Sequence, residues 1–254
     1  MTDAGPVLLV QESAPGVLVM TIDRWARRNS VDTPLAGQLG DAFDRLENDP
    51  SLRVGILTSR GGVFSAGTDL NEGHTPSTES GGEYGVVRRR RSTPVIAAVD
   101  GAALGGGFEL VLACDLVVAS SAAYFQLPEV SRGVVATCGG LFRAADRLPV
   151  HIAHQMLLTG DPISAEQAAG WGFVNVLCEP GEVLAEAEQL AARIIGNSPA
   201  AVAATLDAIS AAGVERDDRG WAVTEAAAAA AAASRDQAEG IAAFLERREP
   251  RWVV

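Results

Sequence analysis

Residues 103–110 read ALGGGFEL and follow an apolar run, Val95–Val99, that is typical of a buried strand. Three glycines lead into a second apolar segment, Gly106–Ala113, which predicts a turn from a strand into a helix. Backbone N–H groups at the start of a helix lack partners and lie at its positive end, so they can bind an anion or a developing oxyanion. The order differs from GxGxxG, and no acidic residue follows at the spacing of a dinucleotide site, which argues against a Rossmann fold. Tight packing of a strand against a helix is the structural alternative.

A second stretch of small residues lies upstream. Val63–Leu70 reads VFSAGTDL and follows the β-rich run Val54–Thr58. Its small residues let the backbone approach a ligand closely. Ser65 does not form a nucleophile elbow, because the residue two before it is Val63 and not glycine. Taken alone, the stretch fits a plain strand-to-helix turn better than a ligand site.

Two glutamates lie in apolar surroundings close to these stretches. Glu109 belongs to the predicted apolar helix, and Glu129 follows an apolar strand that includes Phe125. A carboxylate is costly in an apolar environment unless it is paired or used, and burial raises its pKa toward neutrality. Such carboxyl groups suit general acid–base catalysis. Each glutamate alone is more typical of a solvated or ion-paired side chain, whereas two of them beside a glycine-rich turn favour a catalytic site.

Strand-like and helix-like segments alternate through most of the chain. Val7–Val10 and Val17–Ile22 predict a hairpin, and Leu116–Ala119 predicts a further strand. Thr33 followed by Pro34 predicts a helix with Thr33 as its N-cap and the proline at the first helical position. The alternation predicts an α/β fold with parallel strands.

The second part of the chain is mainly helical. Ser164 with Gln167 fits a capping box. Four helices are expected beyond it, at Glu182–Ile195, Pro199–Ala211, Arg219–Arg235 and Gln237–Arg248. Eight consecutive alanines, Ala226–Ala233, suit a close approach between helices. We therefore divide the chain into a catalytic core, residues 1–195, and a helical C-terminal extension, residues 196–254.

Charge and residue usage exclude several classes of function. The 254 residues include 32 acidic and 20 basic side chains, which gives a net charge of -12. This balance argues against binding to nucleic acid or to an anionic membrane. Every basic residue is arginine, so the chain has no lysine for a Walker phosphate loop, a Schiff base or pyridoxal phosphate.

Metal, disulfide and membrane signals are weak. Cys114, Cys138 and Cys178 are widely spaced and form no CxxC, and His151 with His154 has no evident third metal ligand. No apolar run approaches the ~20 residues that span a bilayer. The N-terminal stretch MTDAGPVLLV lacks the pattern of a secretion signal. We expect a cytoplasmic protein without a metal site.

Taken together, the motifs resemble the crotonase superfamily, the enoyl-CoA hydratase/isomerase family, over nearly the whole chain. The clearest matches are F-x-A-G-x-D-L at Phe64–Leu70 and G-x-A-x-G-G-G-x-E-L at Gly101–Leu110. The other matching segments, in order, are Ile22–Arg24 with Asn29-Ser30, Pro94–Val99, Cys114-Asp115, Pro128-Glu129, Leu158–Gly160, Ala165–Asn175 and Glu239–Pro250. Each segment alone is weak, and the ordered series is a strong signal.

The resemblance implies a spiral of ββα units followed by a helical trimerisation region. It implies a coenzyme A thioester as substrate, with no cofactor besides the coenzyme A that the substrate carries. The family's oxyanion hole maps onto the N–H groups of Thr68 and Gly106, and the two glutamates of its hydratases map onto Glu109 and Glu129. Because the single-carboxylate isomerases usually lack the first glutamate, both carboxylates together favour an enoyl-CoA hydratase, a lyase of fatty-acid or lipid metabolism.

Contacts to the substrate and to other copies of the chain are implied in the same way. A net charge of -12 would repel the phosphates of coenzyme A, so local arginines have to receive them. The expected contacts to coenzyme A and the substrate are Arg27, Arg28, Ala66, Gly67, Asp69, Leu70 and Arg247. The run Arg88–Arg91 is a further basic segment, for which an exposed helix face is the structural alternative. The expected assembly is a homotrimer, or a homohexamer built as a dimer of trimers.

Some features leave the reaction and the acyl group open. Ala136 and Thr137 stand where the family's hydratases usually have proline and glycine, near the acyl pocket. The loop Glu72–Glu83 is a second segment that could shape this pocket. The alternatives to a hydratase are an enoyl-CoA double-bond isomerase and a non-catalytic protein that binds acyl-CoA.

Overall fold

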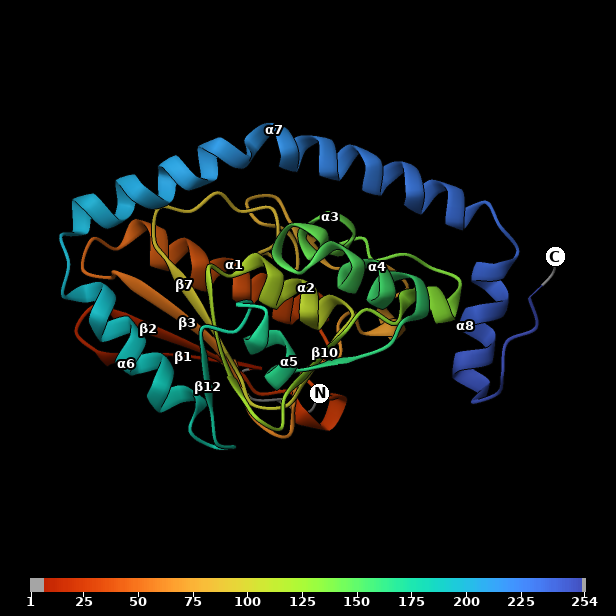
Figure 1. Ribbon diagram of the computed structural model, residues 1–254, viewed down its shortest axis with the longest axis horizontal. Coiled ribbons are helices and arrows are strands. Elements are labelled where there is room, and N and C mark those ends of the chain that lie inside the picture. Colours follow the sequence, from red (N-terminus) through yellow and green to blue (C-terminus); the bar gives the residue numbers. More distant parts are fainter. Residues whose placement is uncertain (1–6, 253–254) are drawn as a thin grey trace.

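In the computed structural model, which describes residues 7–252, strands and helices alternate as expected (Figure 1). The strands are β1 (Leu8–Ala14), β2 (Val17–Ile22), β3 (Val54–Ser59), β4 (Val63–Ser65), β5 (Ser77–Thr78), β6 (Gly82–Glu83), β7 (Val95–Val99), β8 (Ala102–Leu104), β9 (Leu116–Ser120), β10 (Tyr124–Gln126), β11 (Ile163–Ser164) and β12 (Val176–Cys178). The helices are α1 (Thr33–Asn48), α2 (Gly106–Ala113), α3 (Gly140–Arg147), α4 (Val150–Thr159), α5 (Ala165–Gly170), α6 (Val183–Ile195), α7 (Pro199–Ala232) and α8 (Asp236–Glu246), and the short 3-10 helices are η1 (Trp25–Arg27), η2 (Leu70–Glu72) and η3 (Glu129–Arg132). The α/β class is confirmed. The first six residues, on which the reading of the N-terminus partly rests, lie outside the described residues.

Successive strand pairs wind through two sheets, as the implied spiral requires. The larger sheet has the order β1-β2-β3-β7-β9-β12, in which β1 and β2 form the predicted antiparallel hairpin and the other neighbours are parallel. The strands that follow β3, β7 and β9 are β4, β8 and β10, and they form a second sheet of order β11-β10-β8-β4. Each turn of the spiral therefore carries the chain from the large sheet to the small one.

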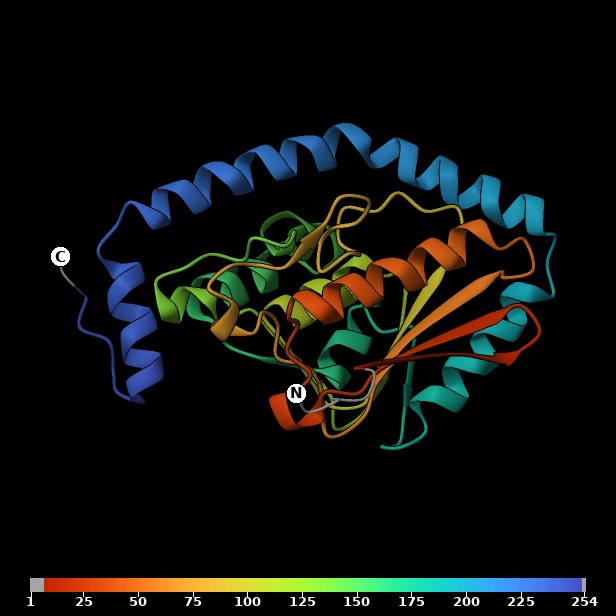
Figure 2. The same ribbon diagram turned by 180° about the vertical axis from the view of Figure 1, so that it is seen from behind.

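Helices cover both faces of the large sheet (Figures 1 and 2). On one face, Ile56 and its neighbours pack with Ala187 of α6. On the other face, Met20 belongs to the main core together with Phe43 of α1 and most of α2. Since side chains alternate along a strand, the mainly apolar and buried strands β2, β3 and β7 contribute side chains to both faces.

The long helix α7 replaces two helices expected from the sequence. Pro199–Ala211 and Arg219–Arg235 were predicted as separate, but one helix of 34 residues runs through both and passes along the edge of the molecule (Figure 1). The residues between the two predicted helices, 212–218, include Gly213, and one glycine costs a helix only about 1 kcal/mol relative to alanine. Ion pairs from Arg143 to Asp217 and from Arg216 to Asp146 hold the middle of the helix. Within residues 7–252, no helix has the length and apolarity that crossing a bilayer requires.

The N-cap of α1 also differs from the prediction. Asp32, not Thr33, caps the helix: its carboxylate accepts the N–H of Leu35 at 3.0 Å. Thr33 takes the first helical position, and its hydroxyl donates to Glu72 at 2.5 Å. The prediction placed the start of the helix one residue too late, because aspartate and threonine are both good N-caps and only the fold selects between them.

The arginine run does not form a helix face. Arg88–Arg91 lies between β6 and β7, with Arg88 in a turn and the next three residues without regular secondary structure. Three of its side chains form ion pairs, Arg88–Glu83, Arg89–Asp44 and Arg91–Asp115. These partners neutralise most of the positive charge of the run, so the run is poorly suited to bind the phosphates of a ligand.

Candidate active site

The predicted turn from strand to helix is present where β8 leads into α2. The helix begins at Gly106, has no side-chain cap, and is buried along its whole length. A Cβ atom on Gly107 would lie 2.1 Å from the backbone oxygen of Ser65, so only glycine allows α2 to pack on β4. Both interpretations of the glycine run therefore hold, since it packs the helix closely and leaves its positive end uncapped.

The loop Ala66–Leu70 lies directly on the first residue of α2. A Cβ atom on Gly67 would lie 2.7 Å from the backbone nitrogen of Gly106, and Gly67 has φ +81°. Among the protein acceptors within residues 7–252, none accepts the N–H of Thr68 or of Gly106. Two unused donors thus lie on adjacent segments, which is the arrangement that an oxyanion site needs.

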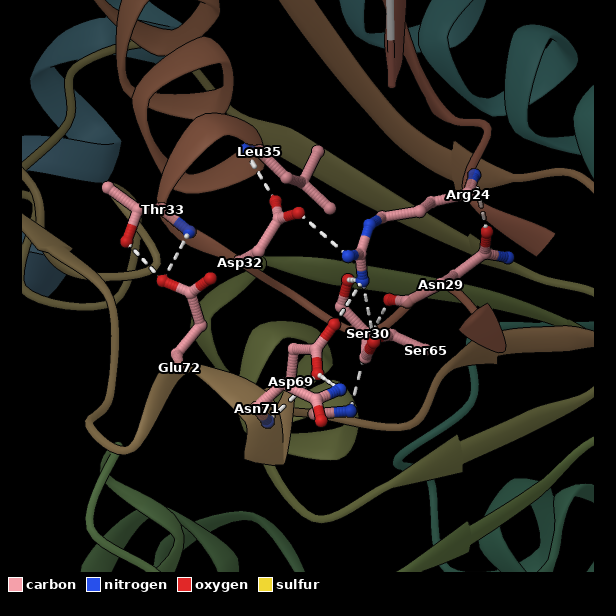
Figure 3. A network of polar contacts seen from close by, with 11 residues as sticks. Arg24, Asn29, Ser30, Asp32, Thr33, Leu35, Ser65, Asp69, Asn71 and Glu72 are labelled. Carbon is pink, nitrogen blue, oxygen red and sulfur yellow. Dashed lines mark hydrogen bonds and ion pairs between the residues drawn. The ribbon is translucent and has the colours of Figure 1, made fainter. Parts of the chain in front are cut away.

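A network of ion pairs holds this loop in place (Figure 3). The guanidinium of Arg24 lies between two carboxylates, 2.8 Å from Asp32 and 2.7 Å from Asp69. Asp69 also accepts the N–H of Asn71 at 3.1 Å. Burial opposes the ionisation of Asp69, but the hydrogen bonds from Arg24 and Asn71 outweigh it and lower its pKa. The Asp69 carboxylate, predicted among the substrate contacts, is therefore engaged inside the protein and positions the loop.

Several of the predicted coenzyme A contacts lie next to the same loop. The N–H of Ala66 donates to the backbone oxygen of Arg28 at 3.0 Å. The side chains of Arg27 and Arg28 are exposed, and Leu70 is 49% exposed. The structure thus brings Arg27, Arg28, Ala66 and Leu70 together at the surface beside Thr68.

Arg247 lies apart from this group, at the end of α8. Its side chain is exposed, and α8 packs on η3, where the guanidinium of Arg132 lies 4.2 Å from the centre of the Phe244 ring. A cavity of about 270 Å³ lies between the two elements, lined among others by Leu104, Gln126, Pro128, Ser131, Arg132 and Arg248.

Glu109 is buried at the base of the site. It is 2% exposed, and its Oε1 accepts the N–H groups of Cys138 at 2.7 Å and of Gly140 at 2.8 Å. Burial, followed by the charge of Glu129, raises the pKa of Glu109, and the two backbone hydrogen bonds offset this only in part. The segment in which Ala136 and Thr137 depart from the family pattern thus leads into the turn that holds this carboxylate.

Glu129 stands at the start of η3, against the glycine turn. Its Oε1 would lie 3.0 Å from a Cβ atom on Gly105. Its Oε2 is buried, and no protein group within residues 7–252 bonds to it. Burial raises the pKa of Glu129 as well. The structure therefore brings the two predicted carboxyl groups together beside the start of α2, each in surroundings that favour its neutral form.

Tyr84 is a polar residue of the site that the sequence did not reveal. It is 1% exposed, and its hydroxyl lies 2.7 Å from Oγ1 of Thr68. The only signal was an aromatic residue set between Gly82 and Gly85, next to the loop expected to shape the pocket. No cluster of His, Cys, Asp or Glu suited to a metal ion occurs within residues 7–252.

Comparisons with known proteins agree with this geometry. A sequence profile described as enoyl-CoA hydratase/isomerase matches residues 12–253. The mevalonyl-coenzyme A hydratase of Aspergillus fumigatus is 37% identical over 271 residues, which cover 99% of this chain and 97% of that protein. The carnitinyl-CoA dehydratase of Proteus mirabilis is 37% identical over 247 residues, covering 93% and 94% of the two chains. The crystal structure of carnitinyl-CoA hydratase from Mycobacterium avium is similar with a TM-score of 0.92 at 36% identity, covering 98% of this chain and 99% of that one. The chain belongs to the enoyl-CoA hydratase/isomerase family, the crotonase superfamily.

Proposed function

We propose that the protein is an enoyl-CoA hydratase that adds water reversibly across the C2=C3 bond of a 2-enoyl-CoA thioester. One observation carries this proposal: the buried carboxyl group of Glu109 and the half-buried one of Glu129 lie beside a pair of unused backbone donors, and the buried Oε2 of Glu129 has no partner within residues 7–252. A buried carboxyl oxygen without a partner is costly, unless water or substrate completes its hydrogen bonds.

The backbone donors are assigned to the thioester oxygen. When water attacks C3, negative charge moves onto that oxygen as an enolate forms. The N–H groups of Thr68 and Gly106 would stabilise this charge, together with the positive end of α2. The opposite end of α2 receives arginines, since Arg91 donates to the backbone oxygen of Ala113 and Arg147 to that of Cys114. The C-terminal end of the helix thus has partners that match its dipole, and the enolate oxygen would be the matching partner at its start.

The two carboxyl groups are assigned to the proton transfers. Glu109, as the carboxylate, orients a water molecule and takes one of its protons while the oxygen bonds to C3. Glu129, as the acid, gives a proton to C2, which completes the 3-hydroxyacyl thioester; dehydration runs these steps in reverse. The overall reaction neither consumes nor releases a net proton or electron. The coenzyme A of the substrate is therefore the only cofactor that the proposal needs.

The absorbance of the conjugated enoyl thioester tests this proposal. Loss of that absorbance with uptake of water supports a hydratase. Conversion of a 3-enoyl into a 2-enoyl thioester without hydration supports an isomerase instead, and binding without either reaction supports a non-catalytic acyl-CoA protein. Since two relatives are named for mevalonyl and carnitinyl thioesters, the substrate panel includes polar as well as plain acyl groups.

Coenzyme A is proposed to bind with its phosphates near Arg27 and Arg28. Replacing both arginines by alanine is expected to weaken thioester binding on the order of tenfold at low salt and less at high salt, because exposed charges are screened. Titration calorimetry at two salt concentrations measures this. Arg193→Ala, which removes an exposed arginine of α6, is the control and is expected to bind as the unaltered protein does. Equal affinity of the double variant and the control at low salt would contradict the assignment.

The helical extension is proposed to form a homotrimer, alone or as a dimer of trimers. Along α7 only Gly220, Trp221 and Thr224 are buried, although the helix is rich in alanine and carries exposed apolar side chains such as Ile209. Exposed apolar side chains on a helix with so little of its surface covered favour packing against other copies with closed symmetry. Light scattering at micromolar concentration is expected to give three or six times the chain mass. A particle of 26.3 kDa alone would refute the assembly.

A further inference from the structure

The Tyr84 side chain touches both residues that supply the proposed oxyanion donors. Its hydroxyl lies 2.7 Å from Oγ1 of Thr68. A Cβ atom on Gly106 would lie 2.0 Å from the same hydroxyl oxygen, so the phenol oxygen stands directly over the Cα atom of Gly106. The phenol oxygen therefore lies beside both the loop of Thr68 and the first residue of α2.

The surrounding loop is built to hold this tyrosine in one place. Tyr84 has φ +58°, a left-handed conformation that is costly for a bulky residue. Its N–H donates to the backbone oxygen of Pro76 at 2.8 Å. A Cβ atom on Gly85 would lie 2.4 Å from the backbone oxygen of Ala36, which shows how tightly the next residue packs on α1. A strained conformation that is fixed this firmly points to a functional side chain.

The two hydroxyl groups leave one hydrogen to donate. Tyr84 and Thr68 each carry one O–H, and their mutual hydrogen bond uses only one of the two hydrogens. Burial, followed by the neighbouring Cys138 and Glu109 side chains, raises the pKa of Tyr84, so the phenol remains a neutral donor, and the Cys138 thiol is the other group beside its hydrogen. The hydroxyl pair thus places a third donor beside the N–H groups of Thr68 and Gly106.

We propose that the Tyr84 hydroxyl is a catalytic hydrogen-bond donor that binds the thioester oxygen as the enolate forms, with its second lone pair held by the Thr68 hydroxyl. This inference rests on the proposed function, because it needs a thioester oxygen between Thr68 and Gly106. In this arrangement the Thr68 hydroxyl donates to the phenol oxygen, and the phenol hydrogen is the one directed at the substrate. A backbone pair and a side chain then share the developing charge.

Tyr84→Phe tests the proposal, since it removes the hydroxyl and keeps the ring that fills the space. The expected result is a loss in kcat on the order of 10² with little change in KM, because removal of one donor to an oxyanion has an effect of about that size. Tyr124→Phe is the matched control, because Tyr124 is the other tyrosine of the chain and lies exposed on β10. If both variants hydrate crotonyl-CoA at the same rate, the proposal is wrong.

A second readout does not depend on turnover. Acetoacetyl-CoA forms an enolate that absorbs in the ultraviolet, and a site that stabilises negative charge on the thioester oxygen favours this form when the ligand binds. Tyr84→Phe is expected to raise the pH at which bound acetoacetyl-CoA ionises, whereas Tyr124→Phe is expected to leave it unchanged. If the unaltered protein binds the enolate and never hydrates an enoyl thioester, the hydratase proposal fails, while the shift in Tyr84→Phe still decides the role of Tyr84.

Thr68→Val separates direct donation from positioning. The variant keeps the Thr68 N–H and removes the hydroxyl that holds Tyr84. Direct donation predicts a smaller loss in kcat for Thr68→Val than for Tyr84→Phe. If the two single variants and the double variant all lose the same amount, Tyr84 acts only through the Thr68 side chain, and the proposed catalytic role is refuted.

Discussion

Glu109→Gln is expected to lower the turnover of a 2-enoyl-CoA on the order of 10²–10⁴-fold, and Glu129→Gln is expected to have an effect of the same size. Each exchange removes a proton-transfer group and keeps the shape of the side chain. The amide oxygen of a glutamine at position 109 can still accept the N–H groups of Cys138 and Gly140, so the local structure is retained. Substrate binding is expected to survive, because the groups proposed to hold the thioester oxygen are backbone N–H groups and not these side chains.

Absorbance of the enoyl thioester measures turnover, and titration calorimetry measures binding. Glu166→Gln is the matched control, since Glu166 is an exposed glutamate on α5. Full activity in both active-site variants would refute the assignment of the pair. Loss of activity in only one would retain that residue as the sole acid–base group, as in the isomerases that the sequence resembles less well.

The pH dependence follows from the raised pKa values of the pair. Hydration needs one carboxyl group ionised and the other protonated, so the rate is expected to rise as the first proton is lost and to fall as the second is lost. Burial raises the pKa of Glu109 and of Glu129. Both the rise and the fall of the rate are therefore expected at pH values above ~4.3, the pKa of a free glutamate. A rate that is flat from pH 5 upward would contradict this.

Stability is expected to change with pH for the same reason. The folded state holds protons on these groups that the unfolded chain releases above about pH 4. The protonated Glu109 and Glu129 therefore contribute fully to the stability of the folded protein below about pH 4. This contribution is lost as the pH rises through the raised pKa values of the two groups. Because glutamine does not ionise, Glu109→Gln is expected to unfold at a higher temperature than the unaltered protein at pH 8, with a smaller difference at pH 5.

Local sequence patterns predicted several of the main strands and helices well. The β2 and β7 strands and helix α2 begin and end where the sequence placed them, because unbroken apolar runs and glycine turns mark their ends. The Ser164–Gln167 capping box is also present. Local patterns did not reveal the second sheet, which only the family resemblance implied, because strands of two or three residues such as β4, β8 and β11 are too short to show a period. Its existence depends on how the turns of the spiral stack.

The candidate site was predictable only in part. Glu109 and Glu129 stand out as carboxylates in apolar sequence, and the structure brings them together. Tyr84 could not be placed, because its contact with Thr68 joins residues 16 apart through a left-handed backbone conformation that only the packing of α1 enforces. Arg24 is similar: it joins Asp32 and Asp69 across three elements, and nothing in the local sequence marks it as the centre of that network (Figure 3).

Gly67→Ala is expected to reduce hydratase activity on the order of 10²–10³-fold, because Gly67 separates the two proposed oxyanion donors. A Cβ atom there would lie 2.7 Å from the backbone nitrogen of Gly106 and 3.2 Å from the backbone oxygen of Leu104, and neither backbone atom can move aside as a side chain can. The loop that carries Thr68 would therefore be pushed away from α2, and the two N–H groups would no longer converge on one oxygen.

Gly172→Ala separates this effect from simple backbone strain. Gly172 has φ +80°, against +81° for Gly67, but a Cβ atom on Gly172 would meet nothing within 4 Å. Both substitutions therefore carry the same conformational cost, about 1–2 kcal/mol of stability, and only Gly67→Ala adds the clash. Thermal unfolding is expected to show destabilisation in both variants, while the loss of turnover and of acetoacetyl-CoA enolate binding is expected only in Gly67→Ala. If Gly172→Ala loses as much activity as Gly67→Ala, the loss comes from strain, and the contact between Gly67 and Gly106 does not set the geometry of the oxyanion site.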